Sequence, residues 1–233
     1  MNFGGIQKNS LIDYPGKLSC VIFLSGCNFY CPYCHNPSLV RKGDECGAPL
    51  ESKALYEFLE SRKDFLDGVV ITGGEPTLQK NLVKLCEIIK GFGYSVKLDT
   101  NGSRPKKLKF LLKHGLVDYA AMDIKTDPDR YNPLVVNKEC NPADIVSSID
   151  TIMESARDYE FRTTCVKGFV DKDTVGKIAR LIKSAKRYAL QKFHKAEMLR
   201  PGFFKDVSPE FSDSELLLFK SIAEPWVKEC IVR

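Results

Sequence analysis

Gly26-Cys27-Asn28-Phe29-Tyr30-Cys31-Pro32-Tyr33-Cys34-His35-Asn36 is the stretch around which the rest of this chain is organised. Its three cysteines have the spacing C-x3-C-x2-C and closely follow the run Cys20-Val21-Ile22-Phe23-Leu24. That run is short, apolar, β-branched and aromatic, and it is bounded by Gly16 and Gly26, which predicts a buried strand. We therefore expect the three thiols on the loop that leaves the carboxyl end of a strand.

Three thiolates so close together on one loop suit a metal or an iron–sulfur cluster better than disulfides, which require paired geometry. A structural zinc site closes with four ligands, and no fourth cysteine follows at short range. A cubane held by three thiolates leaves one iron open to a non-protein ligand. The alternative is a three-thiol zinc site whose distant fourth ligand is His35 or Cys46. The other cysteines form no C-x2-C pair, so a second cluster is not expected.

The composition is that of an ordinary globular chain. With 233 residues, 43% hydrophobic and 28% charged, we expect a single domain over 1–233, with residues 1–18 as a lead-in segment rich in turn signals. The net charge of +5 comes from well-mixed signs and does not favour nucleic-acid binding. No signal peptide or membrane-length apolar run is recognisable, so we expect no membrane association, a cytoplasmic location and reduced thiols.

Predicted strands and helices alternate along the chain. The strands are expected at 19–24, 68–72, 95–98, 116–122, 159–166 and 194–199. The helices are expected at 52–65, 78–90, 105–114, 142–156 and 173–190, with a last helix from a capping pair, Ser212 and Glu215, to near the end. Alternation of this kind predicts an α/β fold with a parallel sheet and right-handed crossovers. Six units favour an incomplete, open-sided barrel over a flat doubly wound sheet, although the pattern separates the two poorly.

Polar or glycine-rich motifs follow the first four predicted strands. They are the cysteine loop, Gly73-Gly74-Glu75-Pro76, Asp99-Thr100-Asn101-Gly102 and Asp123-Ile124-Lys125. The carboxyl ends of parallel strands share one face, and that face holds the site in such folds. The convergence of four motifs on one rim is stronger evidence for a site than any one of them.

Two of these motifs have both a binding and a structural interpretation. Gly73 and Gly74 let a backbone approach a ligand closely, and exposed carbonyls with the Glu75 carboxylate would suit an ammonium group. A tight strand-to-helix turn is the alternative. Asp99 can accept hydrogen bonds from ribose hydroxyls or ligate a cation, or it can simply form an Asx turn before Asn101.

The charged residues are similarly ambiguous. Asp123 and Lys125 lie on the same side of a strand end and can form a site or a rim salt bridge. Arg162 within the fifth predicted strand can hold a ligand carboxylate, or it can pair with Asp123. A basic run overlaps the fifth predicted helix and favours a solvated face over a nucleic-acid groove: Lys183, Lys186, Arg187, Lys192 and Lys195.

Together these residues resemble the radical SAM superfamily, which carries C-x3-C-x2-C after its first strand and Gly-Gly-Glu-Pro after its second. The resemblance covers essentially the whole chain. Asp13-Tyr14-Pro15-Gly16, Cys34-His35-Asn36 and the segments after the third and fourth strands are similar to those of glycyl-radical-enzyme activases. With Gly4-Gly5-Ile6-Gln7-Lys8, the N-terminus is most similar to activating proteins of anaerobic ribonucleoside-triphosphate reductase.

The resemblance implies a partial (βα)6 radical SAM barrel in which Cys27, Cys31 and Cys34 bind three irons of a [4Fe–4S] cluster. S-adenosylmethionine chelates the fourth iron, and one electron from a flavodoxin- or ferredoxin-like donor cleaves it to methionine and a 5′-deoxyadenosyl radical. That radical removes a hydrogen from a glycine Cα of the partner, a glycyl radical enzyme. The implied cofactor contacts are Tyr33, His35, Gly73, Gly74, Glu75, Asp99, Thr100, Asn101, Asp123, Lys125 and Arg162. Asp99, Thr100 and Asp123 can also hold a monovalent cation.

The chain also departs from its relatives. Pyruvate formate-lyase activases carry a histidine after the last strand, whereas this chain has Leu199-Arg200-Pro201-Gly202-Phe203, so the contacts at that end are open. No ferredoxin-like cysteine insert lies between Cys34 and Gly73. The alternatives are an activase of another glycyl radical enzyme, of the pyruvate formate-lyase type, or a small-molecule radical SAM enzyme such as a deazaguanine-forming synthase, against which His35-Asn36 weighs. A further alternative is a colourless zinc or redox module.

Overall fold

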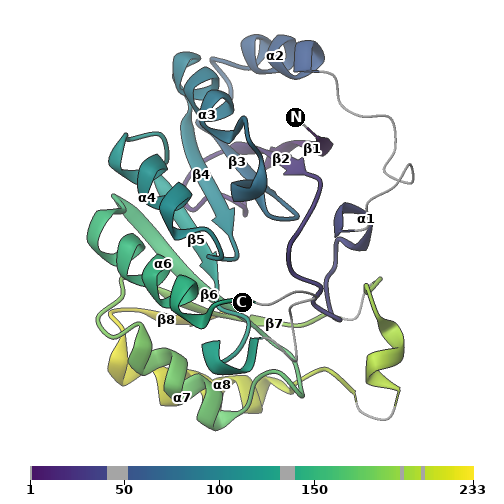
Figure 1. Ribbon diagram of the computed structural model, residues 1–233, viewed down its shortest axis with the longest axis vertical. Helices are drawn as coiled ribbons and strands as arrows, with labels where there is room; N and C mark the ends of the chain where they lie inside the picture. The colour runs from purple at the N-terminus through teal and green to yellow at the C-terminus, as the bar shows by residue number, and fades with distance from the viewer. Residues whose placement is uncertain (1, 41–51, 132–139, 195–196, 206–207) are drawn as a thin grey trace.

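The computed structural model of this chain describes residues 2–40, 52–131, 140–194, 197–205 and 208–233 (Figure 1). One sheet runs through it in the order β1-β2-β3-β4-β5-β6-β7-β8. Strand β1 (Phe3–Ser10) is antiparallel to β2 (Ser19–Leu24), and all later neighbours pair in parallel. The later strands are β3 (Gly68–Gly73), β4 (Ser95–Thr100), β5 (Tyr119–Asp123), β6 (Asp158–Cys165), β7 (Tyr188–Lys192) and β8 (Cys230–Val232).

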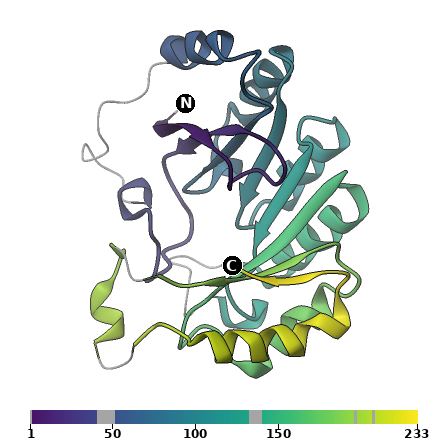
Figure 2. The ribbon, with the colours of Figure 1, turned by 180° about the vertical axis from the view of Figure 1, so that it is seen from behind.

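The strand order decides between the two architectures that the sequence left open. A doubly wound sheet reverses its strand order at a switch point. Here the spatial order follows the chain order from one edge to the other, so the sheet curls in one direction as in a barrel. Among the described residues β1 and β8 do not pair, and the barrel is open on that side (Figures 1 and 2).

Helices lie along the outside of the curved sheet (Figures 1 and 2). The described helices are α1 (Pro37–Val40), α2 (Ser52–Ser61), α3 (Leu82–Gly91), α4 (Pro105–Lys113), α6 (Pro142–Ser155), α7 (Lys172–Leu181) and α8 (Asp213–Ala223). Short 3-10 turns are η1 (Pro76–Leu78), η2 (Pro128–Arg130), η3 (Pro201–Phe204) and η4 (Glu224–Trp226). The capping box predicted at Ser212 and Glu215 begins α8, as expected.

The two faces of the sheet have different chemistry. Strand residues such as Ile22, Ile71 and Leu98 are fully buried against the helices in the main core. On the concave face a smaller cluster consists of Tyr14, Val21, Val70, Tyr119 and Ala121. The rings of Tyr14 and Tyr119 lie 5.8 Å apart, so the turn after β1 closes the amino-terminal end of the barrel. The candidate site lies at the carboxyl-terminal end, among the loops that follow the strands.

The predicted elements at 159–166 and earlier are confirmed to within a few residues, but the two ends of the chain required corrections. Residues 1–18 are not only turns, because β1 pairs along the exposed edge of β2. The helix predicted at 173–190 ends at Leu181, because Ser184 has a positive φ of 69° and its N–H bonds the carbonyl of Trp226. The described residues of the strand predicted at 194–199, which are 194 and 197–199, form no strand; the sixth parallel strand is β7 instead, and β8 follows the last helix. Two predicted helices also have different boundaries. The helix predicted at 52–65 ends at Ser61, and the helix predicted at 78–90 is preceded by the 3-10 turn η1 and begins only at Leu82.

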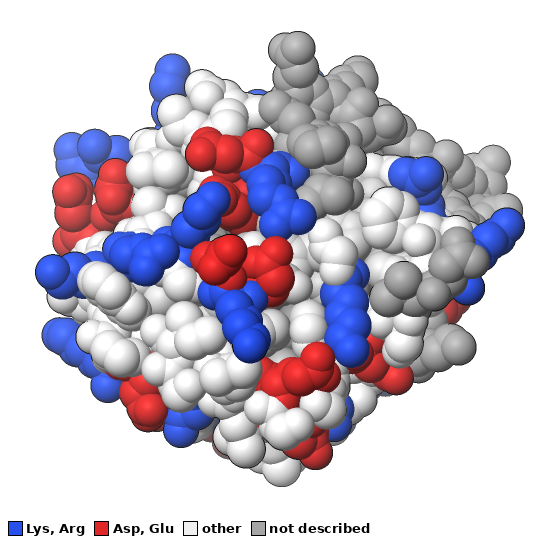
Figure 3. All heavy atoms as spheres, turned by 90° about the horizontal axis from the view of Figure 1, so that it is seen from below, with Lys and Arg blue, Asp and Glu red and all other residues white. Residues whose placement is uncertain are grey.

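The basic run is a solvated, paired surface in the described part of the chain. Lys186, Arg187 and Lys192 form ion pairs with Asp158 at 3.4 Å, Glu229 at 2.6 Å and Asp213 at 2.5 Å. Lys195 lies outside the described residues. Basic and acidic side chains are interspersed on the face in Figure 3. No described helix is both long and apolar enough to cross a membrane.

Candidate active site

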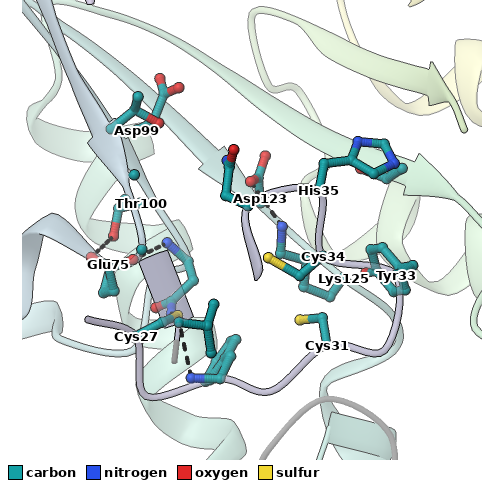
Figure 4. Close-up of a pocket in the computed structure, with 18 residues that line it drawn as sticks. Cys27, Cys31, Tyr33, Cys34, His35, Glu75, Asp99, Thr100, Asp123 and Lys125 are labelled. Carbon is teal, nitrogen blue, oxygen red and sulfur yellow. Dashed lines mark hydrogen bonds and ion pairs between the residues drawn. The ribbon is translucent and has the colours of Figure 1, made fainter. Parts of the chain in front are cut away.

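The loops that leave β2, β3, β4 and β5 surround one cavity of about 210 Å³ that opens to solvent (Figure 4). Every residue predicted for the site except Arg162 lines this cavity. Sequence reasoning missed the other lining residues, which are Phe29, Asn36, Val40, Thr72 and Thr164. Thr72 and Thr164 lie in β3 and β6, where threonine is an ordinary strand residue and carries no site signal.

The cysteine loop is folded tightly against the end of β2. Gly26 has a φ of +97°, and a turn joins Cys34 N–H to the Cys31 carbonyl at 3.0 Å. The Cys27 sulfur accepts a hydrogen bond from Phe29 N–H at 3.4 Å. Burial raises the pKa of the Cys27 and Cys31 thiols to about 12 and also raises the pKa of Cys34. The free thiols are therefore protonated at neutral pH, and a metal must displace their protons on binding.

The placement of the three thiols favours a cluster over a single ion. Among the described residues no three Cys, His, Asp or Glu side chains are close enough to hold one metal ion. The His35 ring instead stacks on Phe193, with the ring centroids 5.0 Å apart. A zinc site completed by His35 therefore has no support from the geometry, and Cys46 lies outside the described residues. Three thiols spread around a cavity fit an inorganic cluster, whose corners separate its ligands.

Gly73 and Gly74 join the second loop to the first. A Cβ on Gly74 would lie 2.1 Å from the Gly26 carbonyl oxygen, and one on Gly73 would lie 2.3 Å from the backbone of Leu24. Two hydrogen bonds of 2.8 Å hold this contact, from Gly74 N–H to the Leu24 carbonyl and from Glu75 N–H to the Gly26 carbonyl. The space that a side chain would need is thus filled by the end of β2 at Gly73 and by the start of the cysteine loop at Gly74, a reason for both glycines that the sequence did not reveal.

Glu75 ties the second loop to the third. Its side chain is fully buried, and Oε1 accepts hydrogen bonds from Thr77 N–H at 3.0 Å and from the hydroxyls of Thr77 at 2.5 Å and Thr100 at 2.8 Å. Oε2 accepts from Asn101 N–H at 2.7 Å. Burial raises the pKa of Glu75, and these donors oppose that shift. Both oxygens are already bonded to the chain itself, so the carboxylate holds the frame of the cavity together.

Asn101 links the loop after β4 to the cysteine loop. Its amide nitrogen donates to Asn28 Oδ1 at 3.0 Å and lies 4.0 Å from the Cys27 sulfur. Asn28 in turn donates to the Ser103 hydroxyl at 2.9 Å. Asn28 was missed in the sequence, although its position beside Cys27 and its side-chain amide, which can both donate and accept, were the available signal.

Five charged side chains form a row of alternating sign on the concave side. Asp99 bonds Lys97 at 2.5 Å and Arg162 at 3.2 Å, and Asp123 bonds Arg162 at 2.6 Å and Lys125 at 2.9 Å. Burial alone would raise the pKa of both aspartates, but the neighbouring cations lower it below the usual range. The pKa of Lys125 is raised, because Asp123 and Cys31 outweigh its burial. The salt-bridge alternatives for Asp123 and Arg162 are thereby confirmed, and Lys97 was missed.

Aromatic side chains wall the other end of the cavity. Tyr33 is buried edge-on against Phe169, with centroids 4.8 Å apart, and its hydroxyl has no hydrogen-bond partner in the described part of the chain. Partial burial lowers the pKa of His35. The segment that departs from the activase pattern also reaches this wall, because Arg200 N–H bonds the Pro32 carbonyl at 3.0 Å and Phe203 packs on Phe169.

The cysteine loop, the glycine turn and the polar residues after β4 and β5 all line one cavity. Residues 21–182 match the Radical SAM superfamily. The chain belongs to this superfamily. The family implies a [4Fe–4S] cluster and S-adenosylmethionine, and the three free thiols that line the cavity fit the cluster.

Two relatives place the chain more finely within the superfamily. A Methanocaldococcus jannaschii protein, named as a candidate glycyl-radical enzyme activating enzyme, is 35% identical over 233 residues, 98% of this chain and 94% of that protein. The pyruvate formate-lyase-activating enzyme of Clostridium pasteurianum is 29% identical over 186 residues, 77% of this chain and 75% of that enzyme. The full-length match places this radical SAM enzyme with the activating enzymes.

Solved structures support the fold. Streptococcus suis SuiB is similar with a TM-score of 0.67 and 13% identity, and the match covers 90% of this chain and 47% of SuiB. SuiB bound to S-adenosylmethionine matches with the same TM-score and 15% identity, over 89% of this chain and 48% of SuiB. This chain thus spans about half the length of SuiB, and at this identity the likeness shows the shared fold alone.

Proposed function

We propose that this protein activates a glycyl radical enzyme, and that its target is the anaerobic ribonucleoside-triphosphate reductase. The observation that carries the proposal is the cavity at the open end of the barrel, where the three cysteine thiols and the motifs after β3, β4 and β5 meet. The full-length relative supports the activating role. The target rests on the similarity of the N-terminal segment, and an open-sided barrel suits a protein substrate that must reach the cavity laterally.

In the proposed mechanism Cys27, Cys31 and Cys34 would hold a [4Fe–4S] cluster, which would supply the electron for reductive cleavage of S-adenosylmethionine. Glu75 keeps the loops after β2, β3 and β4 in register, because its carboxylate accepts from Thr100 and Asn101 and its N–H donates to the Gly26 carbonyl. This rigidity matters because a binding site must hold reactants in a fixed geometry. Lys125 and the Asp123 carboxylate present charge to the cavity, and we assign them to the polar end of S-adenosylmethionine.

The aromatic wall has a separate role in the proposed mechanism. Tyr33 and Phe169 pack edge to face, and the ring of Phe193 stacks on that of His35. We assign Tyr33 and His35 to the adenosine, where their rings exclude water from a reactive intermediate. The electron donor is expected to be flavodoxin- or ferredoxin-like, and the location cytoplasmic.

The proposal is tested by anaerobic reconstitution with iron and sulfide, reduction, and addition of S-adenosylmethionine. We expect a brown chromophore and 5′-deoxyadenosine, and the absence of both would refute every radical SAM assignment. Cys31→Ala should abolish both signals. Cys86→Ala is the matched control, because it removes a thiol buried in the core outside the cavity and should retain them.

The target is tested by electron paramagnetic resonance. The reduced protein is mixed with the anaerobic reductase or with pyruvate formate-lyase, each with S-adenosylmethionine. We expect the glycyl radical doublet with the reductase. A doublet with pyruvate formate-lyase alone would keep the activating role and overturn the target, and deoxyadenosine formation without a doublet on either enzyme would favour a small-molecule substrate.

A further inference from the structure

Lys97 is a buried cation in the middle of a strand. Its side chain is 2% exposed and lies on the concave face of β4, where the residues beside it in the neighbouring strands are Val70 and Tyr119. The Lys97 ammonium lies 6.0 Å from the centre of the Tyr119 ring and 2.5 Å from Asp99 Oδ1. A buried ammonium is costly unless it is paired, so this residue requires an explanation.

Lys97 pairs with Asp99, and with it every carboxylate oxygen of Asp99 and Asp123 has a partner. Asp99 Oδ1 bonds Lys97 and Asp99 Oδ2 bonds Arg162. Asp123 Oδ1 bonds Arg162 and Asp123 Oδ2 bonds Lys125. Each of the four carboxylate oxygens therefore has a cationic partner from the chain itself.

This arrangement does not fit a bound monovalent cation. Such an ion needs oxygen ligands, and a carboxylate that is already paired at both oxygens is a poor one. The row also holds three cations against two carboxylates, so an added cation would enter a site that is already positive. Asp99, Asp123 and Lys125 line the cavity, whereas Lys97 and Arg162 lie outside its lining.

We propose that Lys97 is a positioning residue that replaces a monovalent cation, so that S-adenosylmethionine binds here without one. The inference rests on the proposed function. Lys97 does not contact the cofactor. It neutralises Asp99, which leaves the net positive charge of the row available to the ligand carboxylate.

A purely structural role for Lys97 makes a different prediction. Removal of one partner of a buried ion pair destabilises a fold, because the other charge loses its compensation. If Lys97 only supported the fold, its replacement would change the unfolding midpoint and leave ligand affinity and its salt dependence unchanged. A counter-ion role instead predicts that removal of Lys97 creates a requirement for a small cation.

The experiment measures the dissociation constant of S-adenosylmethionine for the anaerobically reconstituted protein by calorimetry. The two buffers contain either potassium chloride or choline chloride at equal ionic strength, because choline is too bulky to enter between two carboxylates. For the wild type we expect less than a twofold difference between the buffers. For Lys97→Met we expect at least tenfold weaker binding in choline and recovery of most of that loss in potassium.

Lys90→Met is the matched control, since it removes a Lys–Asp pair of 2.9 Å between Lys90 and Asp118, away from the cavity, and should behave as wild type. A tenfold loss of wild-type affinity in choline overturns the inference, as does a folded Lys97→Met protein with wild-type affinity in both buffers. If Lys97→Met does not fold, the difference in wild-type affinity between the potassium and choline buffers decides the inference by itself. Absence of binding in both buffers would instead refute the proposed function and this inference with it.

Discussion

Gly74→Ala tests the contact between the glycine loop and the cysteine loop. The new Cβ would lie 2.1 Å from the Gly26 carbonyl oxygen and 2.6 Å from its carbon, both backbone atoms. Ordinary contact begins at 3.4 Å, so one loop must move by 3.4 − 2.1, or about 1.3 Å. That shift breaks the bond from Glu75 N–H to the Gly26 carbonyl, worth about 1 kcal/mol, and adds about 1–3 kcal/mol of overpacking.

We therefore expect Gly74→Ala to lower the free energy of unfolding by about 2–4 kcal/mol. The assay is urea unfolding of the protein without iron, followed by circular dichroism. Iron content after reconstitution is the second measurement, and it should fall because Gly26 lies directly before Cys27, the first of the three proposed ligands.

Gly91→Ala is the matched control. Gly91 ends α3, its φ is not positive, and a Cβ there meets nothing within 4 Å. Alanine should stabilise that position by about 0.5–1 kcal/mol. If Gly74→Ala were as stable as Gly91→Ala and bound as much iron, the interpretation of Gly74 as a packing glycine would be wrong.

Three further predictions concern the charged row and the aromatic wall. The pKa values of Asp99 and Asp123 are lowered in the fold, so their contribution to stability is complete above about pH 4 and is lost as the pH falls toward the lowered values. Asp123→Asn should therefore flatten the dependence of stability on acid pH, measured by urea titrations from about pH 6 to about pH 2.5. Arg162→Met removes the cation shared by both aspartates and should lower the free energy of unfolding by about 3 kcal/mol. This is the low end for a broken buried ion pair, because each aspartate keeps one lysine partner. An unchanged urea midpoint would contradict the assignment. Tyr33→Phe removes a buried hydroxyl with no partner among the described residues and should leave the protein equally stable or about 1 kcal/mol more stable in thermal unfolding, whereas a large loss would reveal a missing partner.

The location of the site followed from the sequence because it depends on local signals. The strands at 19–24 and 68–72 are short, mainly apolar runs, the strand at 95–98 is short and followed by a turn motif, and the motifs after all three lie at carboxyl ends that share one face. The errors lie elsewhere for a physical reason. Strands β1 and β8 are edge strands whose pairing is contributed by a neighbour, and nothing in segments 3–10 or 230–232 distinguishes a strand from a loop in isolation.

By itself, the sequence determined which chemistry gathers at the rim: three thiols, a glycine turn, two aspartates and a lysine on one end of a parallel sheet. Only the tertiary structure decided how these groups are used. It showed that Gly74 contacts the Gly26 carbonyl, that Glu75 is saturated by its own chain, and that Lys97 and Arg162 occupy the aspartate oxygens. The physical reason is that a hydrogen bond or ion pair depends on which distant segments meet, and alternation along a strand specifies only the face on which a side chain lies.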